Sequence, residues 1–264
     1  MQYVIKTVLA LSVLLYTSIL DYRYREVEPK ILYGSIITAC VLTLAEIIAF
    51  KIFTLYHILS LILSVIVVIV IGLFSYFTGL LGGADVLILI FLALLFPWKF
   101  KMGILPVIEY TTLPIITFII NSLIIVVFYS IYFLLLNIVM YKDEVKKLNT
   151  PFIKKTILLL TGCPMKVSDY LKSKFMYPLE IIKVKENGEI EKEYRLTFNI
   201  EEEYMDHINH VKKLVEKGVL SKDTYIWVTP GIPLIIFILL GFILSITVGD
   251  IILNSFLSTI GTVI

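Results

Sequence analysis

The chain has 264 residues, of which 59% are hydrophobic and 17% charged, and its mean hydropathy is +0.94. Soluble domains usually have about 45–50% apolar and about 25% charged residues, so this composition excludes a water-soluble globular protein. The net charge of +2 provides no basic field for nucleic acid, and Cys40 and Cys163 alone build neither a disulfide framework nor a four-cysteine zinc site.

Six apolar segments are predicted to cross the membrane as helices, because a span of the roughly 30 Å hydrocarbon core takes about 20 residues. In chain order they are 2–20, 31–50, 54–79, 83–97, 113–141 and 229–249. The first run lacks a small-residue cleavage site and ends in a charged cluster, so we expect a true span and no removable signal peptide. The apolar stretch 250–264 is too short to span, and we expect it to lie along the interface.

A segment of different composition separates the last two predicted spans. Residues 142–226 hold 16 of the 23 Lys and Arg residues and 14 of the 21 Asp and Glu residues, as a water-exposed domain would. Asn187-Gly188, between 182–185 and 190–196, predicts a β-hairpin, and 201–219 has the pattern of an amphipathic helix. The predicted fold is thus a polytopic α-helical membrane protein with a small α+β soluble domain between helices five and six. Its predicted parts are 1–141, 142–226 and 227–264.

The number of spans predicts which parts of the chain share one side of the membrane. The ends of spans one, three and five face the same side, which places the loop after Leu20, the loop before Asp85 and the soluble domain together. Basic residues near the membrane are more numerous on that side, so the positive-inside rule favours an external N-terminus and a cytoplasmic soluble domain. Lys142, Lys146 and Lys147 are candidates to contact anionic lipid headgroups there.

Acidic residues outside the polar domain are the strongest functional signal, because each costs about 2.5–3.5 kcal/mol at the centre of a membrane helix. Seven such acids occur: Asp21, Glu26, Glu28, Glu46, Asp85, Glu109 and Asp250. Glu26 and Glu28 belong to a short polar loop where solvation explains them. For Glu46, Glu109 and Asp250, at the edges of spans or in a linker, snorkelling or pairing is the ordinary explanation.

Asp21 and Asp85 differ from the other acids because the spans place both at the same depth on the same side. Gly79, Gly82 and Gly83 precede Asp85, and glycines let backbone unwind around a wet cavity, although small residues also simply tighten helix packing. Two neighbouring carboxyls share one proton, so one acts as a base and the other as an acid. Such a pair can activate water against an amide and protonate the departing nitrogen.

Other catalytic machineries are poorly supplied by this sequence. His207 and His210 share a helix face but lack the HExxH pattern, and a solvated pair is the simpler explanation. His57 stands alone, and no GxSxG, P-loop or GxGxxG motif precedes a suitable helix. Cys163 has no evident base beside it, so we expect a structural role.

Three motifs carry a resemblance to a known family. Gly82-Gly83-Ala84-Asp85 resembles the GxGD signature of aspartyl membrane proteases, with Ala84 in place of the second glycine. The stretch 21–28, Asp-Tyr-Arg-Tyr-Arg-Glu-Val-Glu, resembles the first catalytic loop of the type IV prepilin peptidase branch. The stretch 227–236, followed by Gly249-Asp250, is similar to the C-terminal segment of archaeal preflagellin (archaellin) peptidases.

The resemblance implies a leader peptidase that uses Asp21 and Asp85 as its catalytic pair and needs no metal or other cofactor. Its substrates would be archaellin or pilin precursors, cut at the cytoplasmic membrane face between a basic leader and a hydrophobic helix. Gly82, Gly83 and Ala84 would support the catalytic loop, and Glu26 and Glu28 would attract the basic leader. Bacterial relatives carry a cysteine-rich zinc domain linked to N-methylation, so we expect cleavage without methyl transfer.

Two other classes of function remain open at this stage. A transporter or channel would use the same two aspartates as a proton or cation site, and it requires a wet path that continues to the other face. A noncatalytic assembly subunit would rely on the soluble domain and would tolerate Asn at both aspartates. Within the protease class, nothing in the sequence separates archaellin from pilin precursors.

Overall fold

The structure is a computed structural model that describes residues 2–79, 81–98, 113–184, 190–198 and 202–250. The chain divides into two compact units, Met1–Val126 with Pro233–Ile264, and Val127–Ile232. The predicted interfacial segment 250–264 lies outside the described residues except for Asp250, and Glu109 lies outside them as well.

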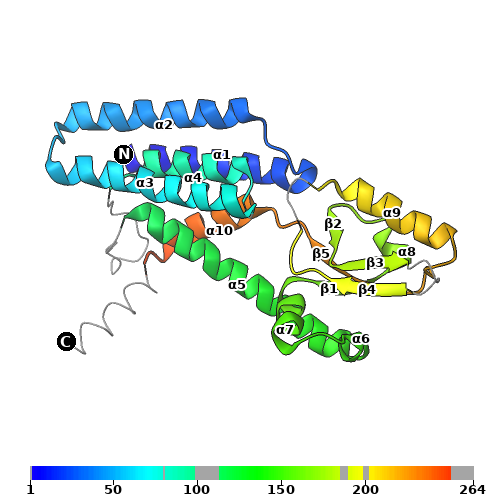
Figure 1. Ribbon diagram of the computed structural model, residues 1–264. Coiled ribbons are helices and arrows are strands. Elements are labelled where there is room, and N and C mark those ends of the chain that lie inside the picture. Colours follow the sequence, from blue (N-terminus) through cyan, green and yellow to red (C-terminus); the bar gives the residue numbers. More distant parts are fainter. Residues whose placement is uncertain (1, 80, 99–112, 185–189, 199–201, 251–264) are drawn as a thin grey trace, which may run out of the picture. The chain divides into compact units, whose positions relative to one another are not determined.

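The first unit is built from helices, which Figure 1 labels along the chain. They are α1 (Gln2–Tyr24), α2 (Pro29–Phe50), α3 (Leu55–Thr78), α4 (Gly83–Leu95), the first half of α5 (Pro114–Met140), and α10 (Leu234–Thr247). Pro29 occupies the first position of α2, where its missing N–H costs no hydrogen bond, and Gly79 ends α3 in a left-handed conformation with φ 64°. Local sequence signals therefore set several helix boundaries.

Within the part of the chain that the structure describes, four helices are long and apolar enough to cross a membrane, namely α1, α2, α3 and α5. The other two predicted spans appear as shorter apolar helices, α4 with 13 residues and α10 with 14, each about 20 Å long. The predicted sixth span began at 229, but residues 225–230 form a strand and the helix begins at Leu234, after Pro230 and Pro233. The first helix runs past its predicted end, so Asp21 lies inside α1.

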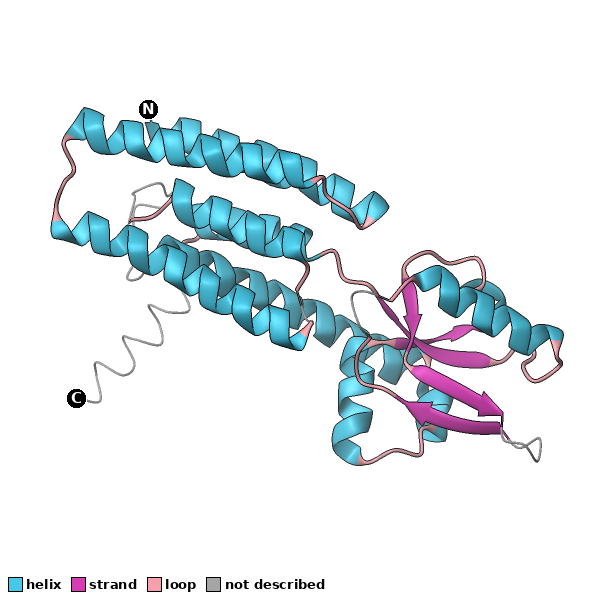
Figure 2. Cartoon of the chain, turned by 45° about the horizontal axis from the view of Figure 1, so that its top comes forward, coloured by secondary structure: helices cyan, strands magenta, loops and turns pink. Residues whose placement is uncertain are grey.

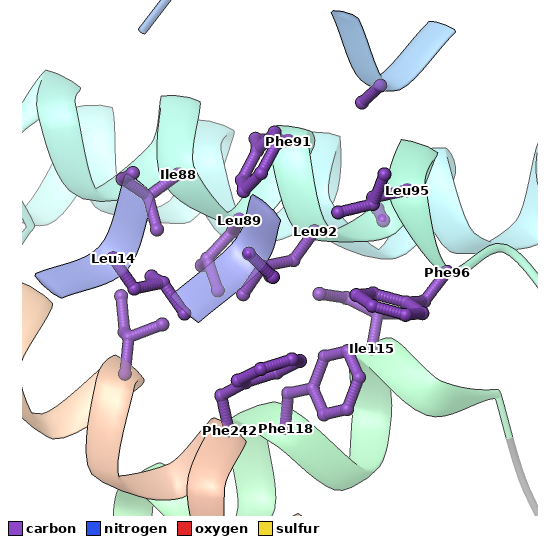
Figure 3. Packing of buried hydrophobic residues seen from close by; sticks show 14 of the residues in the cluster. Leu14, Ile88, Leu89, Phe91, Leu92, Leu95, Phe96, Ile115, Phe118 and Phe242 are labelled. Carbon is purple, nitrogen blue, oxygen red and sulfur yellow. The ribbon is translucent and has the colours of Figure 1, made fainter. Parts of the chain in front are cut away.

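The hydrophobic core of this unit is organised around α4, which contacts α1, α2, α3 and α10. Figure 3 shows Leu14 of α1 and Phe91 of α4 in this core, together with Phe118 of α5 and Phe242 of α10. The Phe118 and Phe242 rings meet edge to face with centroids 5.1 Å apart. Because α4 packs against helices on several sides, these contacts hold the backbone of its first turn in place.

Helices α5 and α10 approach each other closely at Gly241. A Cβ atom at this position would lie 2.1 Å from Ser122 Oγ and 2.5 Å from the Ser122 backbone nitrogen, so only glycine fits. Beside this contact, the Asn121 amide donates hydrogen bonds to Ser245 Oγ at 2.8 Å and to the Gly249 carbonyl at 3.1 Å. The start of α10, which enters the candidate site below, therefore belongs to a tightly fixed helix.

The second unit combines helices and strands, shown in cyan and magenta in Figure 2. In chain order its complete elements are α6 (Lys142–Lys147), α7 (Phe152–Thr161), β1 (Cys163–Lys166), α8 (Val167–Tyr170), β2 (Met176–Pro178), β3 (Glu180–Val184), β4 (Ile190–Tyr194), α9 (Tyr204–Glu216) and β5 (Tyr225–Pro230). Strands β1, β5 and β2 form an antiparallel sheet with β5 in the centre, and β3 pairs with β4. Tyr170, Val211 and Val228 belong to its core.

Two sequence predictions for this unit are confirmed. The predicted hairpin is the antiparallel pair β3–β4, although its Asn187-Gly188 turn lies outside the described residues. The predicted amphipathic helix is α9, which buries Val211 and Leu214. The three-stranded sheet has no counterpart among the predicted elements.

Candidate active site

The two aspartates singled out by the sequence come from the facing ends of α1 and α4. Asp21 lies one turn before the end of α1, and Asp85 is in the first turn of α4. Asp21 and Asp85 are close enough to interact electrostatically, and both also interact with the guanidinium of Arg25. The fold thus brings together two acids and one base from segments far apart in the sequence.

The loop between α3 and α4 determines where Asp85 lies. Ser75 Oγ donates a hydrogen bond to the Leu81 carbonyl at 2.9 Å and accepts one from the Leu81 N–H at 3.0 Å. The Gly82 N–H then donates to Asp85 Oδ2 at 2.8 Å, so the Asp85 side chain reaches back to the N-cap backbone at the start of α4. A Cβ atom at Gly82 would lie 3.3 Å from that same carboxylate oxygen, so glycine permits the close approach.

Asp21 is held by the backbone of a different helix. The Ile235 N–H, in the first turn of α10, hydrogen-bonds Asp21. The first N–H groups of a helix have no partner within it and carry partial positive charge, so a carboxyl group is a suitable acceptor. Asp21 Oδ2 is buried and has no hydrogen-bond partner among the residues that the structure describes. One oxygen of this carboxyl therefore remains available for a water molecule or a substrate.

The other predicted site residues belong to the first turn of α4 and to the loop that follows α1. Gly83 and Ala84 form the first turn of α4 beside Asp85, and a Cβ atom at Gly83 would meet nothing within 4 Å. Glu26 and Glu28 are exposed in the loop between α1 and α2, which begins at Arg25. The loop therefore presents two carboxylates to solvent close in sequence to Asp21.

Glu46, one of the edge acids, is paired rather than available. It forms a salt bridge with Lys6, and these side chains are only 3% and 2% exposed. Lys6 Nζ also donates to Thr43 Oγ1 at 3.1 Å, and the Thr43 hydroxyl donates to the Leu94 carbonyl at 2.8 Å. We call Lys6, Thr43 and Glu46 the buried ion-pair cluster. Pairing was the ordinary explanation for Glu46, and the structure supplies the partner. Asp250 is buried as well.

The competing catalytic groups are engaged elsewhere. Burial raises the pKa of the Cys163 thiol to about 11, so almost no thiolate forms near neutral pH. His207 Nε2 lies 2.7 Å from Glu202 Oε2, and His57 Nδ1 forms a hydrogen bond with Thr54. Among the described residues, no group of three or more His, Cys, Asp and Glu side chains is placed to hold a metal ion.

Sequence reasoning missed two members of this site. The sequence analysis gave Arg25 no role in the site, although it follows the end of α1 directly and stands four residues after Asp21, which was a usable signal. It adopts a left-handed backbone conformation with φ 58°, which is uncommon for a residue other than glycine. Ile235 acts through its main chain, which has no side-chain signature, although it lies inside the motif 227–236.

Comparison with known proteins identifies the family of this chain. Residues 8–141 match the model of the type IV leader peptidase family, and residues 154–251 match the model named archaeal peptidase A24 C-terminus type II. The chain is also 28% identical over 253 residues to a preflagellin peptidase of Methanocaldococcus jannaschii, covering 94% of this chain and 95% of that protein. With its several apolar helices, this chain is a multi-pass membrane protein, and it belongs to the type IV leader peptidase family.

Proposed function

We propose that this chain is a membrane-embedded aspartyl endopeptidase that removes the short basic leader peptide of archaellin precursors at the cytoplasmic membrane face. The observation that carries the proposal is the pairing of Asp21 and Asp85, which interact although they come from different helices. Membership in a leader peptidase family and the similarity to a preflagellin peptidase support the reaction and the substrate class.

The proposed reaction needs one proton shared between the two carboxyls. The ionised carboxylate takes a proton from water as the water oxygen bonds to the carbonyl carbon of the scissile amide. The protonated carboxyl gives its proton to the leaving nitrogen as the carbon–nitrogen bond breaks. After each turnover the pair again holds one proton, and we assign the contact with the water to Asp21 Oδ2, which has no hydrogen-bond partner among the described residues.

The core of the first unit disfavours a transporter that uses the same acids. An ion path would have to continue from Asp21 and Asp85 along α1 and α4 toward their opposite ends. Leu14, Ile88, Phe91 and Leu92 occupy that region as fully buried apolar side chains (Figure 3). Conduction requires water or polar groups along the way, so this packing favours the peptidase.

The decisive experiment is cleavage of archaellin and pilin precursors by membranes that carry wild type, Asp21→Asn or Asp85→Asn. Asp143→Asn is the matched control, because the Asp143 side chain is 86% exposed on α6. We expect wild type and the control to cleave, and each of the other variants to lose about a thousandfold or more in rate. Normal cleavage by either variant would refute the two-aspartate mechanism.

The choice of precursor separates the remaining alternatives. Faster cleavage of archaellin than of pilin precursors would support the proposed substrate, and the reverse would identify a prepilin peptidase of the same family. If the wild-type protein cleaves neither precursor, the result would favour a transporter or an assembly subunit over a peptidase.

The proposed cytoplasmic orientation has its own test. Lys146 is exposed on α6, so Lys146→Cys offers a site for a maleimide that does not cross membranes. Cys163 contributes little background near neutral pH because its pKa is about 11. Labelling from the cytoplasmic side alone is expected, and labelling from the outside alone would reverse the orientation.

A further inference from the structure

A groove of about 520 Å³ lies between the start of α2, the end of α3 and the start of α4. Leu32, Leu81, Val86 and Leu87 contribute to its walls. This volume falls within the range of about 300–1,000 Å³ that is typical of ligand pockets. Since the walls are mainly apolar, the groove favours apolar groups over polar ones.

The groove reaches the loop that carries a proposed catalytic carboxyl. Gly83 and Ala84 line it, and Asp85 follows them directly in the first turn of α4. Both glycine and alanine leave room at this end, and a Cβ atom at Gly83 would still meet nothing within 4 Å. A peptide that places its scissile bond at Asp85 would therefore have the groove available for neighbouring residues.

Two tyrosines on different helices offer large exposed surfaces to an occupant. Tyr33 of α2 is 54% exposed and Tyr76 of α3 is 83% exposed, and both line the groove. Aromatic side chains that become covered on binding contribute strongly to affinity, because each combines a large apolar area with a polar tip.

The charged residues beside the groove favour a peptide over a lipid as its occupant. Val27 lines the groove, and the exposed Glu26 and Glu28 flank it in the α1–α2 loop. Two carboxylates beside the groove repel a phospholipid headgroup, which carries a phosphate, and attract a cationic peptide segment. An acidic rim next to an apolar groove suits a peptide whose basic part is followed by apolar residues.

We infer that this groove binds the apolar residues of the substrate next to the scissile bond, with Tyr33 and Tyr76 as two of its contact residues. The inference rests on the proposed function, since it assumes that Asp21 and Asp85 cut a peptide. It adds a specific binding site for one side of the cut and names the residues that select apolar side chains there.

Kinetics on two substrates test this assignment. The first is the full archaellin precursor, and in the second the apolar residues next to the cut are replaced by serine. Tyr33→Ala and Tyr76→Ala are each expected to raise KM for the first substrate about fivefold to tenfold and to leave kcat nearly unchanged. For the second substrate, whose KM is already high in wild type, the same variants should change KM little.

Phe74→Ala is the matched control, because Phe74 is a 62% exposed aromatic residue of α3 that does not line the groove. Phe74→Ala is expected to have the same KM as wild type for the archaellin precursor. Equal KM changes at positions 33, 74 and 76, or the same changes on both substrates, would overturn the groove assignment while leaving the peptidase proposal intact. A wild-type protein that cleaves no precursor would instead refute the proposed function.

Crosslinking gives a second measurement that does not depend on turnover. A photoreactive phenylalanine in place of Tyr33, in the Asp85→Asn background, is expected to crosslink to the precursor in liposomes. Excess unlabelled precursor should compete, and the same probe in place of Phe74 should react with lipid. Crosslinking of position 33 to lipid alone would identify an acyl chain as the occupant and overturn the inference.

Discussion

The first unit has buried charges at two places, around Glu46 and around Asp21, and they differ in how far these charges are paired. At one end, Glu46 and Lys6 are almost fully buried and neutralise each other, and Thr43 extends their contacts to the backbone of α4. At the other end, Asp21 and Asp85 interact electrostatically with each other and with one positive charge, Arg25, and one carboxylate oxygen of Asp21 lacks a hydrogen-bond partner among the described residues. Lys6 and Asp21 belong to the same helix, about 22 Å apart along its axis.

This difference teaches how to distinguish structural from functional acids in a membrane. Sequence position set Asp21 and Asp85 apart by their shared depth and gave snorkelling or pairing as the ordinary explanation for Glu46. A structural acid has its opposite charge and hydrogen bonds within the protein, whereas a functional pair leaves capacity for a water or a substrate. Substitutions at the two ends should therefore separate stability from activity.

The largest expected effect is on stability at the buried ion-pair cluster. Lys6→Met leaves Glu46 buried without its cation, which should lower the free energy of unfolding by about 3–5 kcal/mol. Unfolding in mixed SDS–detergent micelles measures this change. Replacing both partners, Lys6→Met with Glu46→Met, should restore most of the loss, because no uncompensated charge remains. A double variant as unstable as the single one would contradict this account.

Replacing Arg25 should have a smaller effect, and it should change the activity rather than the stability. Arg25→Gly removes the charge and also relieves the left-handed backbone at φ 58°, so stability should change little. We expect kcat for precursor cleavage to fall about tenfold, corresponding to about 1.4 kcal/mol, as the positive charge beside the two acids is lost. Arg25→Lys keeps the charge and should recover part of kcat. A wild-type kcat in Arg25→Gly would remove Arg25 from the site.

The stabilities of Asp21→Asn and Glu46→Gln compare the two groups of buried acids directly. Asp21→Asn has nearly the same shape and removes one of two neighbouring acids, so the free energy of unfolding should stay equal or rise by about 1 kcal/mol. Glu46→Gln, the same kind of change at the other end, should lower it because Lys6 loses its anion. Destabilisation of both variants to the same extent would show that the two ends do not differ.

The smallest expected effect concerns the exposed loop acids. The double variant Glu26→Gln and Glu28→Gln should raise KM for a basic leader about threefold, because exposed charges each contribute only about 0.2–1 kcal/mol. The effect should shrink as salt concentration rises. A precursor with a neutral leader should show no difference between wild type and this variant. Unchanged kinetics with the basic leader would exclude the two acids from capture.

Composition and spacing were enough to predict much of this architecture. Long apolar runs predicted the four long helices, and the composition change at Lys142 predicted a unit of mixed helix and strand. Asn187-Gly188 predicted the β3–β4 hairpin, because turn chemistry is local. The two aspartates were identified because acids are rare in apolar sequence, and counting spans placed them on one side.

The remaining features depend on which segments become neighbours. The Lys6–Glu46 pair joins residues 40 positions apart, and no local pattern shows that α1 and α2 present them to each other. The predicted span 229–249 took in the last two residues of the strand at 225–230, because the apolar run of α10 follows shortly after them. The groove was missed because it is formed by three helices whose packing the sequence does not display.

The hydrogen bond from the Ile235 N–H to Asp21 has a consequence for sequence divergence among related enzymes. Any residue except proline supplies a main-chain N–H, so this contact can persist while the side chain at position 235 drifts. Packing still restricts the size of that side chain, since Ile235 is 1% exposed. A comparison of sequences would register a hydrophobic position at 235 and overlook its polar contact with the proposed catalytic centre.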